Sequence, residues 1–434
     1  MRTCAISSPI ATQSGYGAHA REFVENLIEQ KSGEWDIKLI SMPWGNTPFT
    51  YPLSESLQKR LVPIPLQYQP DVWVQITVPN EFQPVGKYNI GVTAGTEGDI
   101  CPKEWIESIN KMNVTVVPSN FTKQVFINTS MKHNIPITTN IQVVSEYFND
   151  TVYNRNKKGT LNILNDIEES FCYLFVGHWL QGALGEDRKN ISKLIHTFFE
   201  TFKDTTDSPA LVVKTGGATS SIVDRMSIET KIDEIRDLFP KNTKLPNVYL
   251  LHGELSDNEM NLLYNHKKIK AMVSYTKAEG FGRPLLEFST TGKPIIAPHY
   301  SGQADFLNEK YIVALPGGLT NIHRSAQSQF LIGEARWFTP DYEAAKDLLV
   351  KVYNDYDDYL DNANNQRKHV IKNFTKRAVS KQYKNLVEII DKDIEYIPQA
   401  QQLQLPKLNL PNLNKVDNTK VDLPKLKLPK LEKI

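Results

Sequence analysis

Residues 274–298, which read SYTKAEGFGRPLLEFSTTGKPIIAP, constrain the fold more than any other stretch of this 434-residue chain. They continue a short apolar run, IKAMVS, that has the length and flanks of a buried strand. A glycine-bearing turn then leads into PLLEF, where Pro284 suits the first helical position because its missing N–H leaves no bond unmade. Gly292 ends that helix, and residues 294–297 read as the next strand. The stretch predicts a strand–turn–helix–strand unit whose unpaired N–H groups at the helix start favour an anion.

Two glutamates bracket the turn, with Glu287 eight positions after Glu279. The first carboxylate is placed beside the anion site, and the second lies about one turn into the helix. A carboxylate pair holds a phosphate poorly, but it can accept hydrogen bonds from a diol on each side of that phosphate. A nucleotide sugar offers this arrangement, with a ribose diol, a diphosphate and a hexose diol. The alternative is that both glutamates are solvated and the glycines only form a tight turn, because a lone Gly-x-Gly turn is a weak signal.

The pattern Glu279-x7-Glu287 with Gly-Phe-Gly between them, followed by GKPIIA, resembles the retaining GT-B glycosyltransferases of the family 4 type, the glycosyl transferases group 1. The resemblance covers about residues 1–395. It implies an α/β GT-B fold, with two Rossmann-like, doubly wound parallel-sheet domains that face each other across a cleft. It also implies that Glu279 contacts the donor sugar in catalysis and that Glu287 binds the ribose. The turn would bind the donor sugar and phosphates through its backbone, at Gly280, Phe281, Gly282, Arg283 and Leu285.

The first half of the chain alternates strands and helices, as a doubly wound parallel sheet requires. Strands are predicted at residues 2–8, 37–40, 72–76, 89–93 and 114–117. Residues 9–17 read as a loop before a helix at 18–29, and Ser119 reads as the N-cap of a later helix. Gly15 and Gly17 resemble in position the family's loop near the diphosphate, and Tyr16 between them is predicted to face the acceptor. A plain strand-to-helix turn is the alternative.

A second loop, residues 94–99, leaves the carboxyl end of a predicted parallel strand, where ligands collect in open α/β sheets. Its acids Glu97 and Asp99 are candidate acceptor contacts. Many members of the family that the chain resembles carry a histidine or an acid here. The alternative is an acid-rich loop before a helix.

The second half opens with a predicted strand at 171–177, a loop at 178–187 and a helix at 191–202. In the family resembled, this loop supplies two cations that hold the diphosphate as the sugar–phosphate bond breaks. Arg188 and Lys189 match the second of these two cationic positions, and they are expected to stabilise charge on the leaving group. The first cationic position is occupied by His178 instead of arginine, so the sequence does not decide which residue makes that phosphate contact. A solvated cluster at a helix start is the alternative.

Further strands are predicted at 211–214 and 248–253. Lys214 ends the first and is a candidate phosphate-side cation, and Leu255 follows the second in a segment that resembles the family's base-contacting loop. Ser256 and Glu259 form a capping box for the next helix. Residues 339–383 read as helical, with Pro340 at a helix start.

The domain organisation follows from a lapse of hydrophobic periodicity around residues 147–159, which we interpret as the linker. We predict an acceptor-side domain at 1–150, a donor-nucleotide domain at 160–370 and a terminal helix at 371–397 that crosses back to the first domain. In the remaining tail, 398–434, Leu-Pro-Lys-Leu recurs, and its closely spaced prolines prevent a long helix. The tail is either disordered or an extended segment that contacts a partner or the protein's own fold.

Composition excludes several classes of protein. A net charge of +1 gives no broad argument for binding to nucleic acid or a membrane surface. Three widely separated cysteines suggest neither a disulfide framework nor a zinc site, and they fit a reducing compartment. The opening run is too short for a signal peptide, and no apolar run approaches the about 18 residues of a membrane helix. We expect a cytoplasmic protein with no transmembrane segment.

The sequence therefore predicts a retaining glycosyltransferase that moves a hexose from a UDP- or GDP-linked sugar to a hydroxyl acceptor. No cofactor or metal ion is expected, because no Asp-x-Asp step follows a strand. One alternative is a GT-B protein that binds a nucleotide sugar without transfer, which the histidine at position 178 motivates. Another is a transferase that acts on hydroxylated bases in DNA, which Trp44, the loop cations and the basic tail could serve. Epimerases and phosphorylases share the fold and are further alternatives. The sequence does not decide between saccharide, lipid and protein acceptors.

Overall fold

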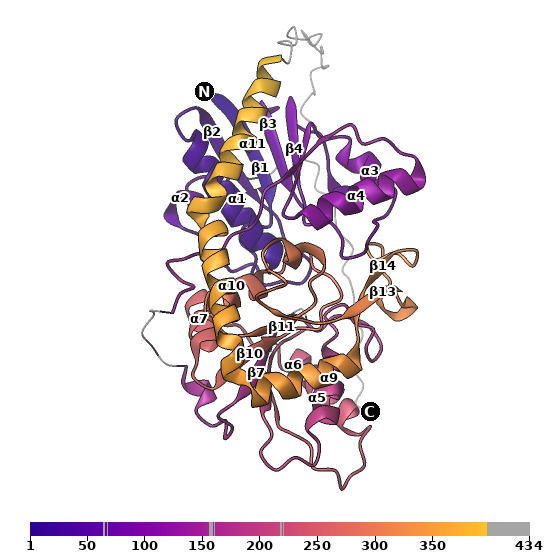
Figure 1. Ribbon diagram of the computed structural model, residues 1–434. Helices are drawn as coiled ribbons and strands as arrows, with labels where there is room; N and C mark the ends of the chain where they lie inside the picture. The colour runs from indigo at the N-terminus through magenta and orange to yellow at the C-terminus, as the bar shows by residue number, and fades with distance from the viewer. Residues whose placement is uncertain are drawn as a thin grey trace, which may run out of the picture. The chain divides into compact units, whose positions relative to one another are not determined.

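The structure is a computed structural model that describes residues 1–396 except 64, 65, 67, 156–158, 160, 218 and 220 (Figure 1). Residues Met1–Ile394 form one unit. The tail predicted at 398–434 and residue 397 of the predicted terminal helix lie outside the described residues. Within the described part, the strands form two parallel sheets of six strands each and one two-stranded antiparallel sheet. The predicted fold, with two Rossmann-like halves, is confirmed.

The first sheet has the strand order β2-β1-β3-β4-β5-β6. Its strands are β1 (Arg2–Ser8), β2 (Trp35–Ser41), β3 (Val72–Ile76), β4 (Tyr88–Val92), β5 (Val114–Val117) and β6 (Asn140–Val143). The helices of this half are α1 (Gly15–Lys31), α2 (Glu55–Gln58), η1 (Pro79–Glu81), α3 (Glu104–Ile109) and α4 (Asn120–His133). Ser119 caps α4 as predicted, because its side chain accepts a hydrogen bond from the backbone N–H of Thr122.

Helix α1 begins three residues earlier than predicted, and part of the predicted loop 9–17 is helical. The Ser14 side chain accepts from the backbone N–H of Gly17 and so starts the helix at Gly15. A Cβ at position 17 would lie 2.3 Å from the carbonyl oxygen of Thr12. The glycine at 17 therefore lets the first helical turn pack against the chain that enters it.

The second sheet has the order β12-β11-β10-β7-β8-β9. Its strands are β7 (Cys172–Val176), β8 (Ala210–Lys214), β9 (Val248–Leu251), β10 (Ile269–Val273), β11 (Ile295–Ala297) and β12 (Val313–Ala314). The helices of this half are η2 (Asn162–Leu164), α5 (Ile191–Phe202), α6 (Ile222–Arg236), α7 (Asp257–Asn265), α8 (Arg283–Ser289), η3 (Ser301–Asp305), η4 (Arg324–Ala326), α9 (Tyr342–Asn354), η5 (Tyr356–Tyr359), α10 (Leu360–Asn373) and α11 (Lys376–Tyr396).

Alternate residues of the second sheet's strands face two different cores, which explains why helices cover both of its faces. In β7, Cys172 and Leu174 pack with α7 and α8, whereas Tyr173 and Phe175 pack with α5, α6 and α9. A strand of apolar residues that is buried on both faces is typical of a parallel, doubly wound sheet. This arrangement directs the carboxyl ends of the strands, and the loops that follow them, to one edge.

A β-hairpin between the sheet and α9 was not predicted. Strand β13 (Gly317–Asn321) pairs antiparallel with β14 (Arg336–Pro340), so Pro340 ends a strand and the prediction of a helix start there is wrong. Helix α9 begins at Tyr342 because Asp341 accepts from the backbone N–H groups of Glu343 and Ala344. The hairpin also contacts the first half of the chain, since the Thr96 hydroxyl donates to the carbonyl of Phe330 at 2.9 Å.

Helix α11 contacts the first half of the chain. Lys31 forms an ion pair with Asp391 at 2.6 Å, and the Tyr88 hydroxyl donates to Asp393 at 2.7 Å. Of the helices in the described residues, none is long and apolar enough to cross a membrane.

Candidate active site

The turn predicted as the centre of the site joins β10 to α8 at the edge between the two halves. Gly282 lies before α8 with a φ of 103°, a conformation that glycine adopts without strain. The Ser119 hydroxyl, from the first half, donates to the carbonyl of Gly280 at 2.7 Å. A Cβ on Gly280 would lie 2.8 Å from the carbonyl oxygen of Ala94. The glycines therefore allow the turn to lie directly against the loop that follows β4.

The predicted catalytic residues come together around one carboxylate. Lys189 contacts Glu279 at 2.5 Å, and Arg188 contacts the other oxygen of the same carboxylate at 3.2 Å. Arg188 also reaches Glu97 on the first half at 3.3 Å. We call these four residues, Glu97, Arg188, Lys189 and Glu279, the Glu279 cluster. It contains two acids and two bases from three separate segments.

Glu279 is fixed in place and ionised. Its carboxylate accepts from the Thr276 hydroxyl at 2.6 Å, and its backbone N–H donates to Ser301 at 2.8 Å. Burial alone would raise the pKa of Glu279, but the charges of Lys189 and Arg188 lower it to about 2. A buried, ionised carboxylate can accept hydrogen bonds from sugar hydroxyls, and the two cations beside it can contact phosphate oxygens.

Glu287 lies on the buried side of α8. The Tyr264 hydroxyl donates to its carboxylate at 3.3 Å, and the Arg283 guanidinium lies 3.6 Å away. Burial raises the pKa of Glu287 to about 7, although the charge of Arg283 opposes that rise. Glu279 and Glu287 thus have different electrostatic surroundings. Glu279 is ionised at neutral pH, whereas the pKa of Glu287 lies close to neutral pH.

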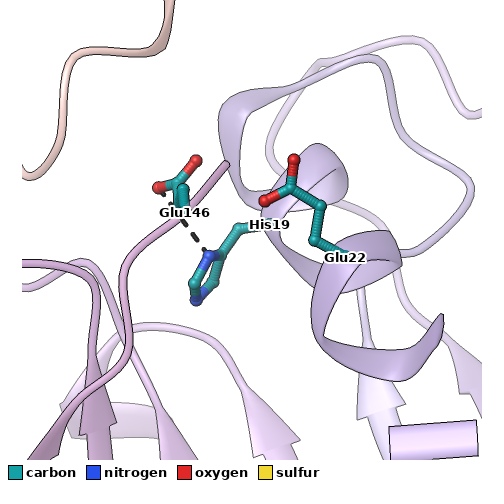
Figure 2. Close-up of side chains that lie close together, drawn as sticks. All are labelled: His19, Glu22 and Glu146. Atoms are coloured by element: carbon teal, nitrogen blue, oxygen red, sulfur yellow. Dashed lines mark ion pairs between the residues drawn. The ribbon is translucent and has the colours of Figure 1, made fainter. Parts of the chain in front are cut away.

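Arg283 makes contacts that the sequence did not predict. Its guanidinium lies 2.6 Å from Glu22 and 3.0 Å from Glu146, both of which belong to the first half. Beside them lies His19, whose Nδ1 is 3.7 Å from a carboxylate oxygen of Glu146. Figure 2 marks this ion pair with a dashed line. Both ring nitrogens of His19 are buried, and neither has a hydrogen-bond partner among the residues that the structure describes. We call His19, Glu22, Glu146, Arg283 and Glu287 the Arg283 cluster.

The acidic side chains of the Arg283 cluster are buried, and they outnumber its one arginine. His19, Glu22 and Glu146 offer ligand atoms within 4.8 Å of one another, which is close enough to be considered as a metal site. Arg283 already donates to both carboxylates, however, so we interpret the group as an ion-pair network between the halves. Burial raises the pKa of Glu22 to about 8. We therefore expect the carboxyl group of Glu22 to keep its proton at neutral pH.

This titration predicts how stability depends on pH. A carboxyl group whose pKa rises on folding, here from 4.5 to about 8, stabilises the fold fully below pH 4.5 and loses that effect as the pH rises through 8. We expect the melting temperature of the wild type, relative to that of Glu22→Gln, to fall between pH 5 and pH 8. Thermal unfolding at four pH values measures this difference. Glu229→Gln on the exposed face of α6 is the control, and parallel curves for wild type and Glu22→Gln would contradict the assignment.

The other residues predicted on the first half lie near the Glu279 cluster but are held by structural contacts. The Tyr16 hydroxyl lies 3.1 Å from that of Thr93 and accepts from the backbone N–H of Ala94. Gly15 and Gly17 belong to the first turn of α1. Glu97 joins Arg188, whereas Asp99 binds Arg336 of β14 at 3.0 Å. Asp99 thus fixes the hairpin, and a direct contact with an acceptor stays a prediction.

The remaining donor-side residues are dispersed along the second half. Lys214 donates to the carbonyl of Gly253 at 2.6 Å, and the pKa of His178 is lowered by burial and then by the nearby charge of Lys189. Phe281 and Leu285 are buried in the core, and Leu255 packs against it. The side chains of these three apolar residues therefore stabilise the fold, and the predicted contacts through their backbone stay predictions.

Sequence reasoning missed Glu22, Glu146 and His19 as part of the site, together with Thr276 and Ser301, which hold Glu279. The residues of the first group are far apart in the chain and carry no shared spacing. Thr276 and Ser301 lie within or next to the stretch that opens the sequence analysis. Ser301 meets Glu279 only when the chain folds back, whereas Thr276 bonds Glu279 locally, three residues further on. Two buried acids facing one helix-start arginine could not be found without the tertiary structure.

Comparison with known proteins finds a family model that matches part of the chain. Residues 184–327 match the family model described as glycosyl transferases group 1. This segment contains Arg188, Lys189, Glu279 and Glu287, the residues that carry the resemblance. The chain matches none of the curated proteins with which it was compared.

Solved structures with the same fold cover most of the chain at low identity. Sucrose-phosphate synthase from Thermosynechococcus elongatus is 14% identical, with a TM-score of 0.58, over 91% of this chain and 100% of the other. HepE from Anabaena, in complex with UDP and glucose, is 10% identical, with a TM-score of 0.58, over 90% of this chain and 100% of the other. The lipopolysaccharide outer core galactosyltransferase WaaB is 14% identical, with a TM-score of 0.54, over 90% of this chain and 100% of the other.

The group 1 match over residues 184–327 and the GT-B fold together support a glycosyltransferase. The fold of the described residues is that of the GT-B neighbours.

Proposed function

We propose that the protein is a retaining glycosyltransferase that transfers a hexose from a UDP- or GDP-linked sugar to a hydroxyl acceptor without a metal ion. The Glu279 cluster carries this proposal, because it places an ionised carboxylate within 3.2 Å of two cations beside a helix start. The HepE structures with UDP and with UDP-glucose support a uridine donor.

In the proposed reaction, the bond between the anomeric carbon and the leaving phosphate oxygen breaks. The acceptor hydroxyl oxygen forms its bond to the same face of that carbon, and its proton passes to the leaving phosphate. No side chain serves as a covalent nucleophile in this scheme. Arg188 and Lys189 stabilise the charge that develops on the diphosphate, which is the role that a metal ion would otherwise fill.

The other residues bind and orient the substrates. Glu279 accepts from hydroxyls of the donor sugar, and Glu287 accepts from the ribose diol. The backbone of residues 280–285 contacts the sugar and phosphates, with Lys214 and Gly15 on the phosphate side and Leu255 near the base. Tyr16 and Glu97 face the acceptor. We place the enzyme in the cytoplasm, since its three buried cysteines are all free.

A nucleotide-release assay tests the donor site. UDP-, GDP- and ADP-sugars are incubated with wild type and with Glu287→Ala in the presence of a metal chelator and without acceptor. We expect slow hydrolysis of one donor by the wild type. Because Glu287 binds the ribose in both ground and transition states, its loss should raise KM about tenfold or more with a smaller change in kcat.

The same assay separates this function from binding without transfer. If a donor binds tightly, as isothermal titration calorimetry would detect, but no nucleotide is released with any acceptor class, the protein is a binding module. An equal loss of binding in Glu229→Gln, an exposed control on α6, would mean that the Glu287 effect is not specific to the site.

A further inference from the structure

A cavity outside the proposed donor site lies in the second half of the chain, with a volume of about 590 Å³. Its walls are the loop at 184–186, the first turn of α5, residue 277, the hairpin around β13 and the start of α9. A volume of this size matches pockets that hold small molecules. We call it the hairpin pocket.

The charges that line the hairpin pocket are mostly positive. Lys193, Lys277 and Arg324 face one acid, Glu186. The Lys277 side chain is 2% exposed, and its ammonium lies 3.4 Å from the half-buried carboxylate of Glu186. Among the residues that the structure describes, Lys193 and Arg324 take part in no ion pair. The pocket therefore keeps a net positive charge that an anion would neutralise.

The rest of the lining suits a sugar. Thr320 and Thr339 contribute hydroxyls that lie 2.6 Å apart, and Asn321 adds an amide. Tyr342 offers an aromatic face, over which the Lys193 ammonium lies at 5.0 Å from the ring centroid. Hydroxyls and amides both donate and accept, as the hydroxyl groups of a saccharide require. The lining thus combines cations with groups that recognise hydroxyls.

Two chain segments and the hairpin connect this pocket to the Glu279 cluster. Glu186 lies two residues before Arg188, and Lys277 two residues before Glu279. Strand β14 of the hairpin binds Asp99, in the loop that also carries Glu97. A ligand in the pocket is therefore next to the walls of the proposed reaction site.

We propose that the hairpin pocket binds an acidic saccharide, a sugar that bears a phosphate or a carboxylate, as the distal part of the acceptor. The binding itself is a property of the pocket, and the acceptor role rests on the proposed function. Lys193 and Arg324 contact the acidic group, and the threonines and Asn321 contact the hydroxyls.

Calorimetric titration of the full chain tests the pocket. The probes are glucose 6-phosphate, glucuronate, inorganic phosphate and glucose. We expect a phosphorylated or carboxylated sugar to bind at least tenfold more tightly than both glucose and inorganic phosphate. The double variant Lys193→Ala/Arg324→Ala should lose that preference, whereas Lys241→Ala/Lys310→Ala, which removes the same charge from exposed positions, should keep it.

Several results would overturn the proposal. If glucose bound as tightly as the acidic sugars, the pocket would not recognise an anionic group. If inorganic phosphate bound as tightly as the acidic sugars, the pocket would hold an adventitious ion only. Unchanged binding in Lys193→Ala/Arg324→Ala would place the ligand elsewhere. Donor hydrolysis is measured on the same proteins and should be unchanged in both double variants. Hydrolysis without acidic-sugar binding defeats this proposal alone, and binding without hydrolysis of any donor defeats the proposed function alone.

Discussion

Glu279→Gln is expected to lower kcat/KM for the donor by roughly 10²- to 10³-fold, the scale for removing one preorganised polar group from an active site. The amide keeps the size of the side chain but removes the charge that Lys189 and Arg188 contact at 2.5 and 3.2 Å. Both cations then lose the partner that holds them in position for the diphosphate. The sugar also loses an ionised acceptor for its hydroxyls. Initial rates of nucleotide release measure the effect.

Two controls make this result specific. Glu229→Gln removes a carboxylate from an exposed pair on α6 and should leave the rate unchanged. Circular dichroism and thermal unfolding should show that Glu279→Gln remains folded. If the variant were folded and released nucleotide at a rate within threefold of the wild type, Glu279 would have no role in the reaction.

Arg283→Met is expected to destabilise the protein by about 3–5 kcal/mol, the cost of leaving a buried charge without its partner. Three carboxyl groups, those of Glu22, Glu146 and Glu287, lie around this one guanidinium, at 2.6, 3.0 and 3.6 Å. Each of them is at most 8% exposed, so water cannot replace the lost cation. The melting temperature should fall by several degrees.

A combined variant separates charge from packing. Glu22→Gln/Glu146→Gln/Arg283→Met removes the base together with its two nearest acids and leaves Glu287. Replacing buried ion pairs by neutral residues is often close to neutral in stability. We expect it to recover much of the loss. If Arg283→Met melted at the wild-type temperature, or if the triple variant were less stable than Arg283→Met, the cluster would not join the two halves by charge.

The strands and the centre of the site were accessible from the sequence because their signals are local. Strands β1, β3 and β5 and helix α5 have the predicted bounds, since each is an apolar run or stripe with clear ends. The hairpin was missed because every residue of β13 is exposed and its sequence, GGLTN, has no hydrophobic alternation. Helix α6 was missed for a related reason, as only Ile228, Ile232 and Ile235 of its residues are buried.

The same distinction holds for the site. Arg188, Lys189 and Glu279 were each predicted as site residues because local motifs resemble those of the family, Arg188 and Lys189 as cations for the diphosphate and Glu279 as a contact of the donor sugar. The Arg283 cluster depends on how α1 and the segment after β6 meet α8, which no periodicity encodes. The roles of individual residues toward donor and acceptor stay predictions.

The central claim, transfer with retention from a nucleoside-diphosphate sugar, is tested most directly by proton NMR of donor hydrolysis in a chelating buffer. The wild type is mixed with the α-linked donor that the release assay selects, and the first sugar released is observed before it mutarotates. The proposed mechanism predicts the α-anomer, since the new bond forms on the face from which the phosphate leaves. Release of the β-anomer, or the absence of hydrolysis with every donor, would contradict it.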